Sequence, residues 1–315
     1  MNLLELAARY PQRAEGGVPE WMLGHFRRRT ISFADGRSDE RTQVHWLQSR
    51  SFTIDLRLPD APALPVRAWQ DYDAAELRQL ANHEGWVADS VWENGYLSWH
   101  GGVSLQLHNR WPEPAQLQRI GNCMIEFGTT GAYVEDWRLQ ASRGPLIGLR
   151  LLEECDAESG EVLQRGGGLI LCGEQLGWVH GRGREPGESA LQLRERAERA
   201  QGDGEALSAL FDCETSLAYA DQQGRYQVAL STVPARVGQM VSLEGFELPG
   251  AGRVCQHLQR PDGRAVVRTF LIDTLEPDWR ADLVTPSTDE AQRWFAAEGE
   301  TLSRYLEAVS YTHLT

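Results

Sequence analysis

Three carboxylates lie close together near the middle of the chain, and each could exchange a proton if it were held away from water. Glu126 precedes a turn bounded by glycines, and Glu135 and Asp136 follow that turn. Neighbouring residues of a strand point to opposite faces, so no more than one of Glu135 and Asp136 can point inward. Burial raises the pKa of a carboxylate and makes it a candidate general acid or base. The alternative is a structural ion pair with Arg138 or Arg150.

One histidine and two arginines could recognise the polar part of a ligand. His180 shares a strand face with Trp178, so an interior position would make it a hydrogen-bonded core residue or, alternatively, a ligand-binding or acid–base group. Arg50 and Arg143 lie in corresponding Trp-containing segments, and a guanidinium group binds a carboxylate in bidentate geometry. The alternative for both arginines is an ion pair at the rim of a barrel.

Standard catalytic motifs are missing from the sequence. There is no G-x-S-x-G nucleophile elbow and no H-E-x-x-H metal motif. The glycines at 166–168 are followed by Leu-Ile-Leu, which is not a phosphate-binding loop. The five cysteines are odd in number, widely spaced and without a Cys-x-x-Cys pair, which fits neither a disulfide framework nor a zinc site. We therefore expect no metal and no cofactor, although a catalytic site assembled from distant residues would leave no such motif.

Composition and charge argue against two classes of partner. The formal net charge is −14 and lysine is absent, whereas nucleic-acid binding depends largely on basic side chains that face phosphates. No apolar run is long enough to cross a membrane, and the N-terminus lacks the basic and apolar regions of a signal peptide. These features predict a cytoplasmic protein that binds neither nucleic acid nor a membrane. They do not predict its oligomeric state.

Short strands at steady spacing must position the candidate side chains. Residues 42–58 form a long extended segment, or a bent strand pair, in which Trp46, Gln48 and Arg50 alternate onto one face. Asn94-Gly95 is a strong hairpin turn. Many short strands with few helices are typical of a sandwich or a barrel.

Helices are expected at only a few places. Asp73 begins a capping-box pattern that predicts a short helix, and Ser189 and Gln192 form a similar pattern ahead of a second helix. Residues 207–220 are expected to form a strand. A last helix beginning near 287–290 carries an apolar stripe that should dock on a barrel wall.

One pattern occurs twice in the chain. Residues 45–58 and residues 136–151 each open with Trp and Leu-Gln and close with Leu-Arg-Leu. Self-similarity of this kind indicates repeated units, and closed barrels remove exposed strand edges. We predict an N-terminal barrel domain, a second barrel domain, a C-terminal helix that docks on a barrel and a non-native tail, over residues 1–127, 128–285, 286–309 and 310–315.

Two of these segments also resemble a known group of proteins. Residues 42–59 (TQVHWLQSRSFTIDLRLP) and 131–139 (GAYVEDWRL) are similar to the two-domain calycin-like proteins of fungi and bacteria, in which two lipocalin-like barrels are fused. The resemblance implies a mostly β fold with two tandem antiparallel barrels and a hydrophobic or heterocyclic ligand. It implies no catalytic residues.

We therefore predict a protein that binds a small apolar or aromatic molecule inside a barrel. One alternative is a cofactor-independent acid–base enzyme (an isomerase, cyclase or hydrolase) that uses a barrel-interior carboxylate or histidine. The other is a protein-interaction module with filled barrels. The predicted ligand-binding residues are four tryptophans that would stack on the ligand and four polar residues that would orient it: Trp46, Trp99, Trp137, Trp178, Gln48, Arg50, Arg143 and His180.

Overall fold

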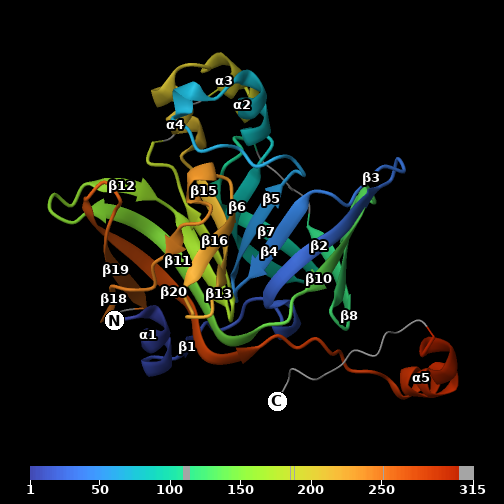
Figure 1. Cartoon of the computed structure of the whole chain (residues 1–315). Coiled ribbons are helices and arrows are strands. Elements are labelled where there is room, and N and C mark those ends of the chain that lie inside the picture. Colours follow the sequence, from blue (N-terminus) through green and yellow to red (C-terminus); the bar gives the residue numbers. More distant parts are fainter. Residues whose placement is uncertain (109–113, 185, 188, 251, 305–315) are drawn as a thin grey trace.

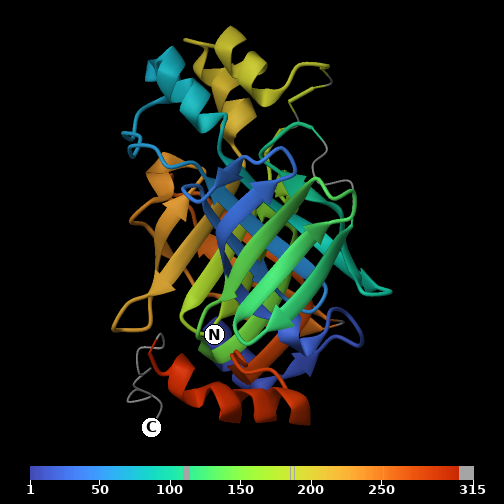
Figure 2. The same cartoon turned by 90° about the vertical axis from the view of Figure 1, so that its right-hand side faces the viewer.

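The computed structural model describes the whole chain except residues 109–113, 185, 188, 251 and 305–315. Two β-sheets make up most of it, with a group of helices at one end and a C-terminal helix at the other (Figures 1 and 2). None of the described helices is long and apolar enough to cross a membrane.

The first sheet closes into a barrel of eight antiparallel strands, because its last strand pairs with its first. The short strand β3 (Ser38–Asp39) pairs with β2 outside this ring. The barrel strands are β2 (Gly24–Phe33), β4 (Gln43–Gln48), β5 (Phe52–Leu58), β6 (Glu84–Glu93), β7 (Tyr96–Ser104), β8 (Ala115–Ile120), β9 (Cys123–Gly128) and β10 (Tyr133–Leu139).

Local turn chemistry fixes several of these strands. Asn94 (φ 54°) and Gly95 (φ 85°) both adopt the left-handed conformation that the predicted two-residue hairpin between β6 and β7 requires. Of the two alternatives for residues 42–58, the strand pair is confirmed: they form the hairpin β4–β5, which turns at residues 49–51. β10 was expected in the second unit, yet it pairs with β2 and β9 and so belongs to the first barrel.

The second sheet is curled but open, because its end strands β17 and β18 do not pair with each other. The mostly β fold class is therefore confirmed, with one closed barrel and one half-barrel. In order across the sheet, the strands are β17 (Met240–Val241), β16 (Tyr226–Ser231), β15 (Glu214–Ala220), β14 (Gln175–His180), β13 (Gly167–Cys172), β11 (Arg143–Asp156), β20 (Ala265–Arg280), β19 (Arg253–Gln259) and β18 (Phe246–Gly250), with β1 (Gln12–Arg13) on β20 and β12 (Val162–Arg165) on β11.

The barrel and the half-barrel share one hydrophobic core. Leu47 and Ile54 on the outer wall of the barrel pack closely over Gly177 of β14. A Cβ atom added to Gly177 would lie 3.1 Å from the Leu47 side chain. The other face of the second sheet is covered by α1 (Leu3–Arg9), which buries Leu3 and Leu6 against it. Large apolar cores of this kind supply most of the stabilisation of a fold.

A buried carboxylate ties the β4–β5 turn to the second sheet. Asp273 on β20 accepts hydrogen bonds from Ser49 Oγ (2.5 Å) and from the backbone N–H of Arg50 (2.9 Å). The Arg50 guanidinium is 2% exposed and forms an ion pair with Glu276, at 2.7 Å from Nε to Oε1. Arg50 therefore links the two sheets and lies outside the barrel interior.

Three helices form a cap with its own apolar cluster at one end of the molecule (Figure 1). They are α2 (Ala74–Leu80), α3 (Leu193–Arg199) and α4 (Gly204–Phe211). The capping box at Asp73 is confirmed, whereas α3 is capped by Gln192 and not by Ser189. The strand predicted over 207–220 is wrong for its first part, because Leu207, Leu210 and Phe211 have helical spacing and pack into this cap.

The C-terminal helix α5 (Asp289–Leu302) differs from its prediction. None of its described residues is buried, and Trp294 and Phe295 are 52% and 54% exposed, so this part of the helix does not dock on a barrel wall (Figure 1). The predicted continuation of its apolar stripe beyond Arg304, and the tail 310–315, lie outside the described residues.

The two similar segments occupy different places in the fold. Residues 45–58 lie within the β4–β5 hairpin, whereas residues 136–151 begin in β10 of the barrel and end in β11 of the second sheet. What they share is one position: Trp46 and Trp137 both point into the same barrel interior, with ring centroids 5.4 Å apart.

Candidate functional site

Four tryptophans fill the middle of the closed barrel. Trp46, Trp86, Trp99 and Trp137 come from β4, β6, β7 and β10 and meet edge to face, with centroid separations of 5.4 to 6.2 Å. This is the favoured geometry for aromatic pairs. Indole rings from four different strands therefore form a single aromatic wall around the barrel axis.

A layer of charged side chains lies beside these indoles. Glu135 accepts a hydrogen bond from Arg28 Nη1 (2.8 Å) and lies 3.8 Å from Arg57 Nη1, while Arg57 Nε donates to Asp55 Oδ1 (2.8 Å). Glu126 lies in the same interior, 4% exposed, and Glu135 is 1% exposed. Charges inside a protein persist only when they are paired, and these pairs meet that requirement.

Among the carboxyl groups of the lumen, Glu126 is one whose pKa is raised. Its Oε2 accepts a hydrogen bond from Trp137 Nε1 (2.9 Å) and its Oε1 accepts one from Tyr133 Oη (3.2 Å). Burial, reinforced by the negative charge of Glu135, raises the pKa of Glu126 to about 8, although Arg57 opposes the shift. Glu126 is therefore protonated at neutral pH and can donate a proton.

The prediction about these carboxylates is resolved by the strand geometry. Glu135 points into the barrel, and Asp136 points out, where it pairs with Arg138 at 2.9 Å. Glu126 joins Glu135 inside, because Glu126 and Glu135 are directly opposite each other on β9 and β10. Two carboxyl groups thus lie side by side in the interior. In such a pair one group tends to stay protonated while the other is ionised, because two neighbouring negative charges repel each other.

Two of the four indoles have a buried N–H without an acceptor. Trp46 Nε1 donates to Gln48 Oε1 (3.1 Å) and Trp137 Nε1 donates to Glu126. Trp86 Nε1 and Trp99 Nε1 are buried and have no hydrogen-bond partner among the described residues. A buried donor without an acceptor costs about 1–3 kcal/mol. The lumen therefore presents two donors that an acceptor atom of a ligand would satisfy.

The space between these side chains is small in this conformation. A cavity of about 10 Å³, enough for one water molecule, lies among the tryptophans and the charged layer. Its lining residues are Trp46, Thr53, Asp55, Arg57, Trp86, Trp99, Glu126, Glu135 and Trp137.

Few described residue pairs join β7 to β8 next to Trp99. Strands β7 and β8 share only two residue pairs, Tyr96 with Gln116 and Leu97 with Ala115, so the rest of β7 has no paired neighbour on that side among the described residues. Trp99 lies two residues beyond the last pair and is partly exposed. Gly102 (φ 84°) lies in a bulge just after Trp99, where a Cβ atom would collide with the Val87 carbonyl. Trp99 is therefore the interior indole with the most freedom to move.

The eight predicted ligand-binding residues do not form one site. Trp46, Trp99, Trp137 and Gln48 lie in the first barrel, where Gln48 is fully buried below the indoles. Arg50 lies in the inter-sheet ion pair described above, and Arg143 is exposed at the start of β11.

Trp178 and His180 belong to a second cluster, in the half-barrel. The Arg268 guanidinium stacks over Trp178 at 4.7 Å, and its Nε donates to Glu154 Oε2 (2.6 Å). His180 Nε2 lies 3.5 Å from the same carboxylate oxygen. Burial, followed by the positive charges of Arg268 and other arginines, lowers the pKa of His180 well below its usual value, so this histidine is neutral. It lies beside the ion pair, and its buried Nε2 has no hydrogen-bond partner among the described residues.

Sequence reasoning missed Trp86 and the charged residues of β2 and β5. If residues 42–58 were one strand, the alternation that starts at Trp46 would put Phe52, Ile54 and Leu56 on the same face. The turn at residues 49–51 puts the other face of β5 into the lumen. Trp46 pairs with Asp55, and paired residues point to the same side of a sheet, so Thr53, Asp55 and Arg57 face the lumen. A one-residue change of register moves a whole strand to its other face. The available signal was the polar alternation Thr53, Asp55, Arg57 itself.

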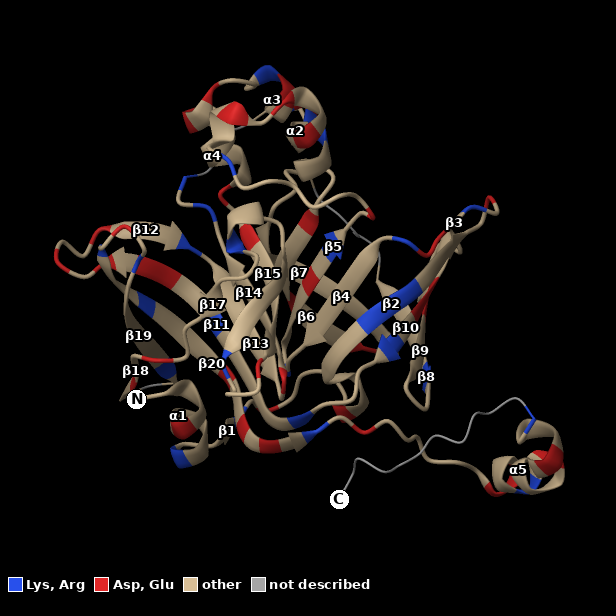
Figure 3. Ribbon diagram, in the orientation of Figure 1, with Lys and Arg blue, Asp and Glu red and all other residues tan. Residues whose placement is uncertain are grey.

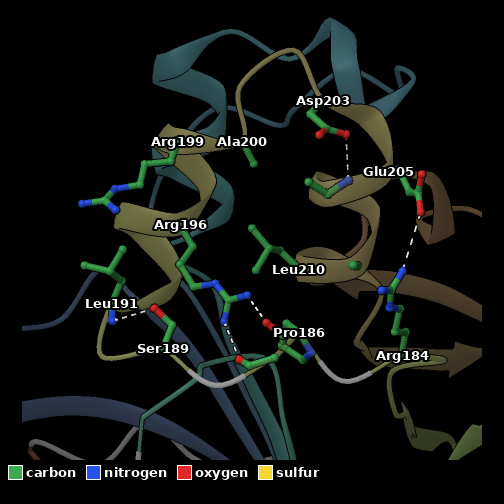
Figure 4. A pocket seen from close by; sticks show the side chains of 13 residues that line it. Arg184, Pro186, Ser189, Leu191, Arg196, Arg199, Ala200, Asp203, Glu205 and Leu210 are labelled. Carbon is green, nitrogen blue, oxygen red and sulfur yellow. Dashed lines mark hydrogen bonds and ion pairs between the residues drawn. The ribbon is translucent and has the colours of Figure 1, made fainter.

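A larger hollow exists on the helical cap, and Figure 4 shows its side chains. It has a volume of about 680 Å³ and lies between α3, α4 and the segment before α3. Arg196 Nη1 donates to the Gly187 carbonyl (3.0 Å), and Arg184 lies 3.6 Å from Glu205. Two of its guanidinium groups are therefore engaged by the walls of the hollow. The barrel lumen is the better-defined candidate.

Comparisons of this chain with protein-family models, with curated proteins and with solved structures gave no match.

Proposed function

We propose that the closed barrel binds one small, flat aromatic or heterocyclic molecule that carries a hydrogen-bond acceptor. The observation that carries this proposal is the pair of buried indole N–H groups, Trp86 and Trp99, without an acceptor beside a protonated Glu126. A ligand that stacks between indoles and accepts their hydrogen bonds would remove the cost of leaving those donors unpaired. Small-molecule sites usually combine apolar walls with a few such polar groups.

Binding requires the lumen to open, because its present volume holds only one water. Trp99 is the side chain that moves, since it is partly exposed and pairs with β6 but with no described residue of β8. Its displacement frees a space of the size of an indole ring. The closed eight-stranded barrel also agrees with the resemblance to calycin-like proteins, whose barrels enclose ligands.

A filled barrel that serves only as an interaction module would have a fully satisfied interior. The unpaired N–H groups of Trp86 and Trp99 and the carboxyl pair Glu126–Glu135 count against that alternative. One observation does favour the enzyme alternative: a pKa of about 8 lets Glu126 give and take a proton near neutral pH. In that case the same bound molecule is the substrate, and Glu126→Gln retains binding while losing turnover.

Replacing Trp99 by alanine should convert the filled lumen into an open site. The matched probes are quinoline, whose ring nitrogen accepts a hydrogen bond, and naphthalene, which has the same shape without an acceptor. Trp86 Nε1 remains as a donor in the variant. We expect Trp99→Ala to bind quinoline about tenfold more tightly than naphthalene, the effect of one hydrogen bond, as measured by titration calorimetry.

The control is Trp294→Ala, which removes an indole that is 52% exposed on α5 and should bind both probes as the wild-type protein does. A thermal melt confirms that Trp99→Ala is folded. Equal affinities for quinoline and naphthalene in folded Trp99→Ala would show that the indole donors do not select an acceptor.

A further inference from the structure

A second hollow lies on the outer wall of the barrel and is rich in arginine. It has a volume of about 520 Å³ and is bounded by β2, by the end of β10 and by the segment leading into β4. Figure 3 shows arginines on β2 and β10 in this region. Its lining residues are Arg27, Arg28, Arg29, Glu40, Arg41, Thr42, Gln43, Asn122, Arg138 and Gln140. Five of these ten residues are arginine in a chain whose net charge is −14.

The strand register places like charges opposite each other in this hollow. Arg27 on β2 is the direct cross-strand partner of Arg138 on β10. Like charges directly opposite on neighbouring antiparallel strands destabilise a sheet. Arg29, the next outward residue of β2, adds a third positive charge at the β-bulge where the pairing shifts. An arrangement that costs stability in the empty protein becomes favourable when an anion lies between the guanidinium groups.

The arginines of the hollow are only partly neutralised by the protein. Arg138 pairs with Asp136 at 2.9 Å, and Arg41 pairs with Asp60 at 2.5 Å. Arg27 and Arg29 are exposed, and their side chains form no ion pair or hydrogen bond with any described residue. Against these two free cations the hollow has one lining carboxylate, Glu40.

An unused donor inside the hollow points to the same kind of ligand. Arg138 Nε is buried and has no hydrogen-bond partner among the described residues, although Nη2 of the same guanidinium is engaged by Asp136. A free Nε–H next to the guanidinium of Arg27 forms part of the fork that binds phosphate or carboxylate oxygens. The amide side chains of Asn122 and Gln140 lie at the same hollow and could bind a neutral part of the ligand.

We propose that this hollow binds a small phosphorylated molecule, held by Arg27, Arg29 and Arg138. Arg28 lines this hollow and also pairs with Glu135 of the lumen. The three arginines of the proposal do not line the lumen cavity, so this inference does not depend on the lumen ligand. A volume of about 520 Å³ suits a small molecule. The planar guanidinium group of arginine can bind two phosphate oxygens at once, in bidentate geometry.

The test is a calorimetric titration of the intact protein with inorganic pyrophosphate at 0.15 M salt. We expect one binding site, and at least a tenfold loss of affinity in the double variant Arg27→Ala/Arg29→Ala. The control Arg194→Ala removes an exposed arginine of α3 and should leave the affinity unchanged. Because both substituted side chains of the double variant are exposed and unpaired, its melting temperature should not fall below that of the wild-type protein.

Three outcomes would overturn the proposal. The first is the absence of pyrophosphate binding by the wild-type protein, and the second is an equal affinity in the folded double variant. The third is a single-stranded oligonucleotide that binds far more tightly than pyrophosphate at the same salt, since this would show that the hollow serves a polymer and not a small molecule.

Discussion

Replacing Glu126 by glutamine should abolish a loss of stability that the wild-type protein shows as the pH rises from about 5 to about 8. The unfolded state has the ordinary carboxyl pKa of 4.5, whereas burial and Glu135 raise the folded-state pKa to about 8. Below pH 4.5 both states hold the proton and the contribution of Glu126 to stability is complete. Between the two pKa values only the folded state holds it, so stability falls by about 1.4 kcal/mol for each pH unit.

Glutamine mimics the protonated acid and does not titrate. We therefore expect the unfolding free energy of Glu126→Gln to match that of the wild-type protein near pH 5 and to exceed it by a few kcal/mol at pH 8. Urea denaturation of both proteins at several pH values measures this difference, and taking the difference cancels the titration of other groups. The control Glu93→Gln changes an exposed carboxylate of β6 and should give a flat difference. If the difference in unfolding free energy between Glu126→Gln and the wild-type protein also did not change with pH, Glu126 would be ionised in the folded protein at neutral pH.

Replacing Trp46 by alanine should cost the protein about 3–5 kcal/mol of unfolding free energy, as is usual for a large aromatic residue in a core. Trp46 is 2% exposed and lies against Phe26 (5.4 Å between centroids) and Trp137 (5.4 Å). Its Nε1 also donates to Gln48, whose amide oxygen would lose that bond. Among the described residues, no other indole of the lumen contacts as many aromatic rings, so its loss removes the most aromatic contacts.

Urea denaturation of Trp46→Ala and of Trp294→Ala provides the measurement and its control. Trp294 is 52% exposed, and its replacement should change the unfolding free energy by less than about 0.5 kcal/mol. A cost below about 1 kcal/mol for Trp46→Ala would contradict the packed aromatic interior described above.

Features set by short stretches of sequence were predictable. The hairpin at Asn94-Gly95 depends on two residues that tolerate positive φ, and the helix after Asp73 depends on a capping box four residues long. The mostly β fold class follows from many such local signals. The inward-facing carboxyl of Glu135 was likewise predictable as one of two options from strand alternation.

Features set by distant contacts were not predictable. The turn at residues 49–51, which decides which face of β5 enters the lumen, is held by Asp273, more than 200 residues further along the chain. The place of β10 in the first barrel depends on its pairing with β2. Leu207 and Phe211 become helical because a cap cluster receives them, and closure of the second sheet fails because its short end strands do not meet. Tertiary context decides each of these cases.

Native mass spectrometry of the intact protein, purified gently from a bacterial host and compared with the denatured mass, tests the central claim most directly. The lumen hypothesis predicts an additional small mass that is released on denaturation and belongs to an aromatic molecule with a hydrogen-bond acceptor. The fraction of protein that carries this mass should be lower in Trp86→Phe, which lacks one of the two free donors. Two results together would contradict the assignment of the barrel as a ligand-binding site. The wild-type protein would show only its own mass under these conditions, and the folded Trp99→Ala variant would bind neither quinoline nor related acceptors.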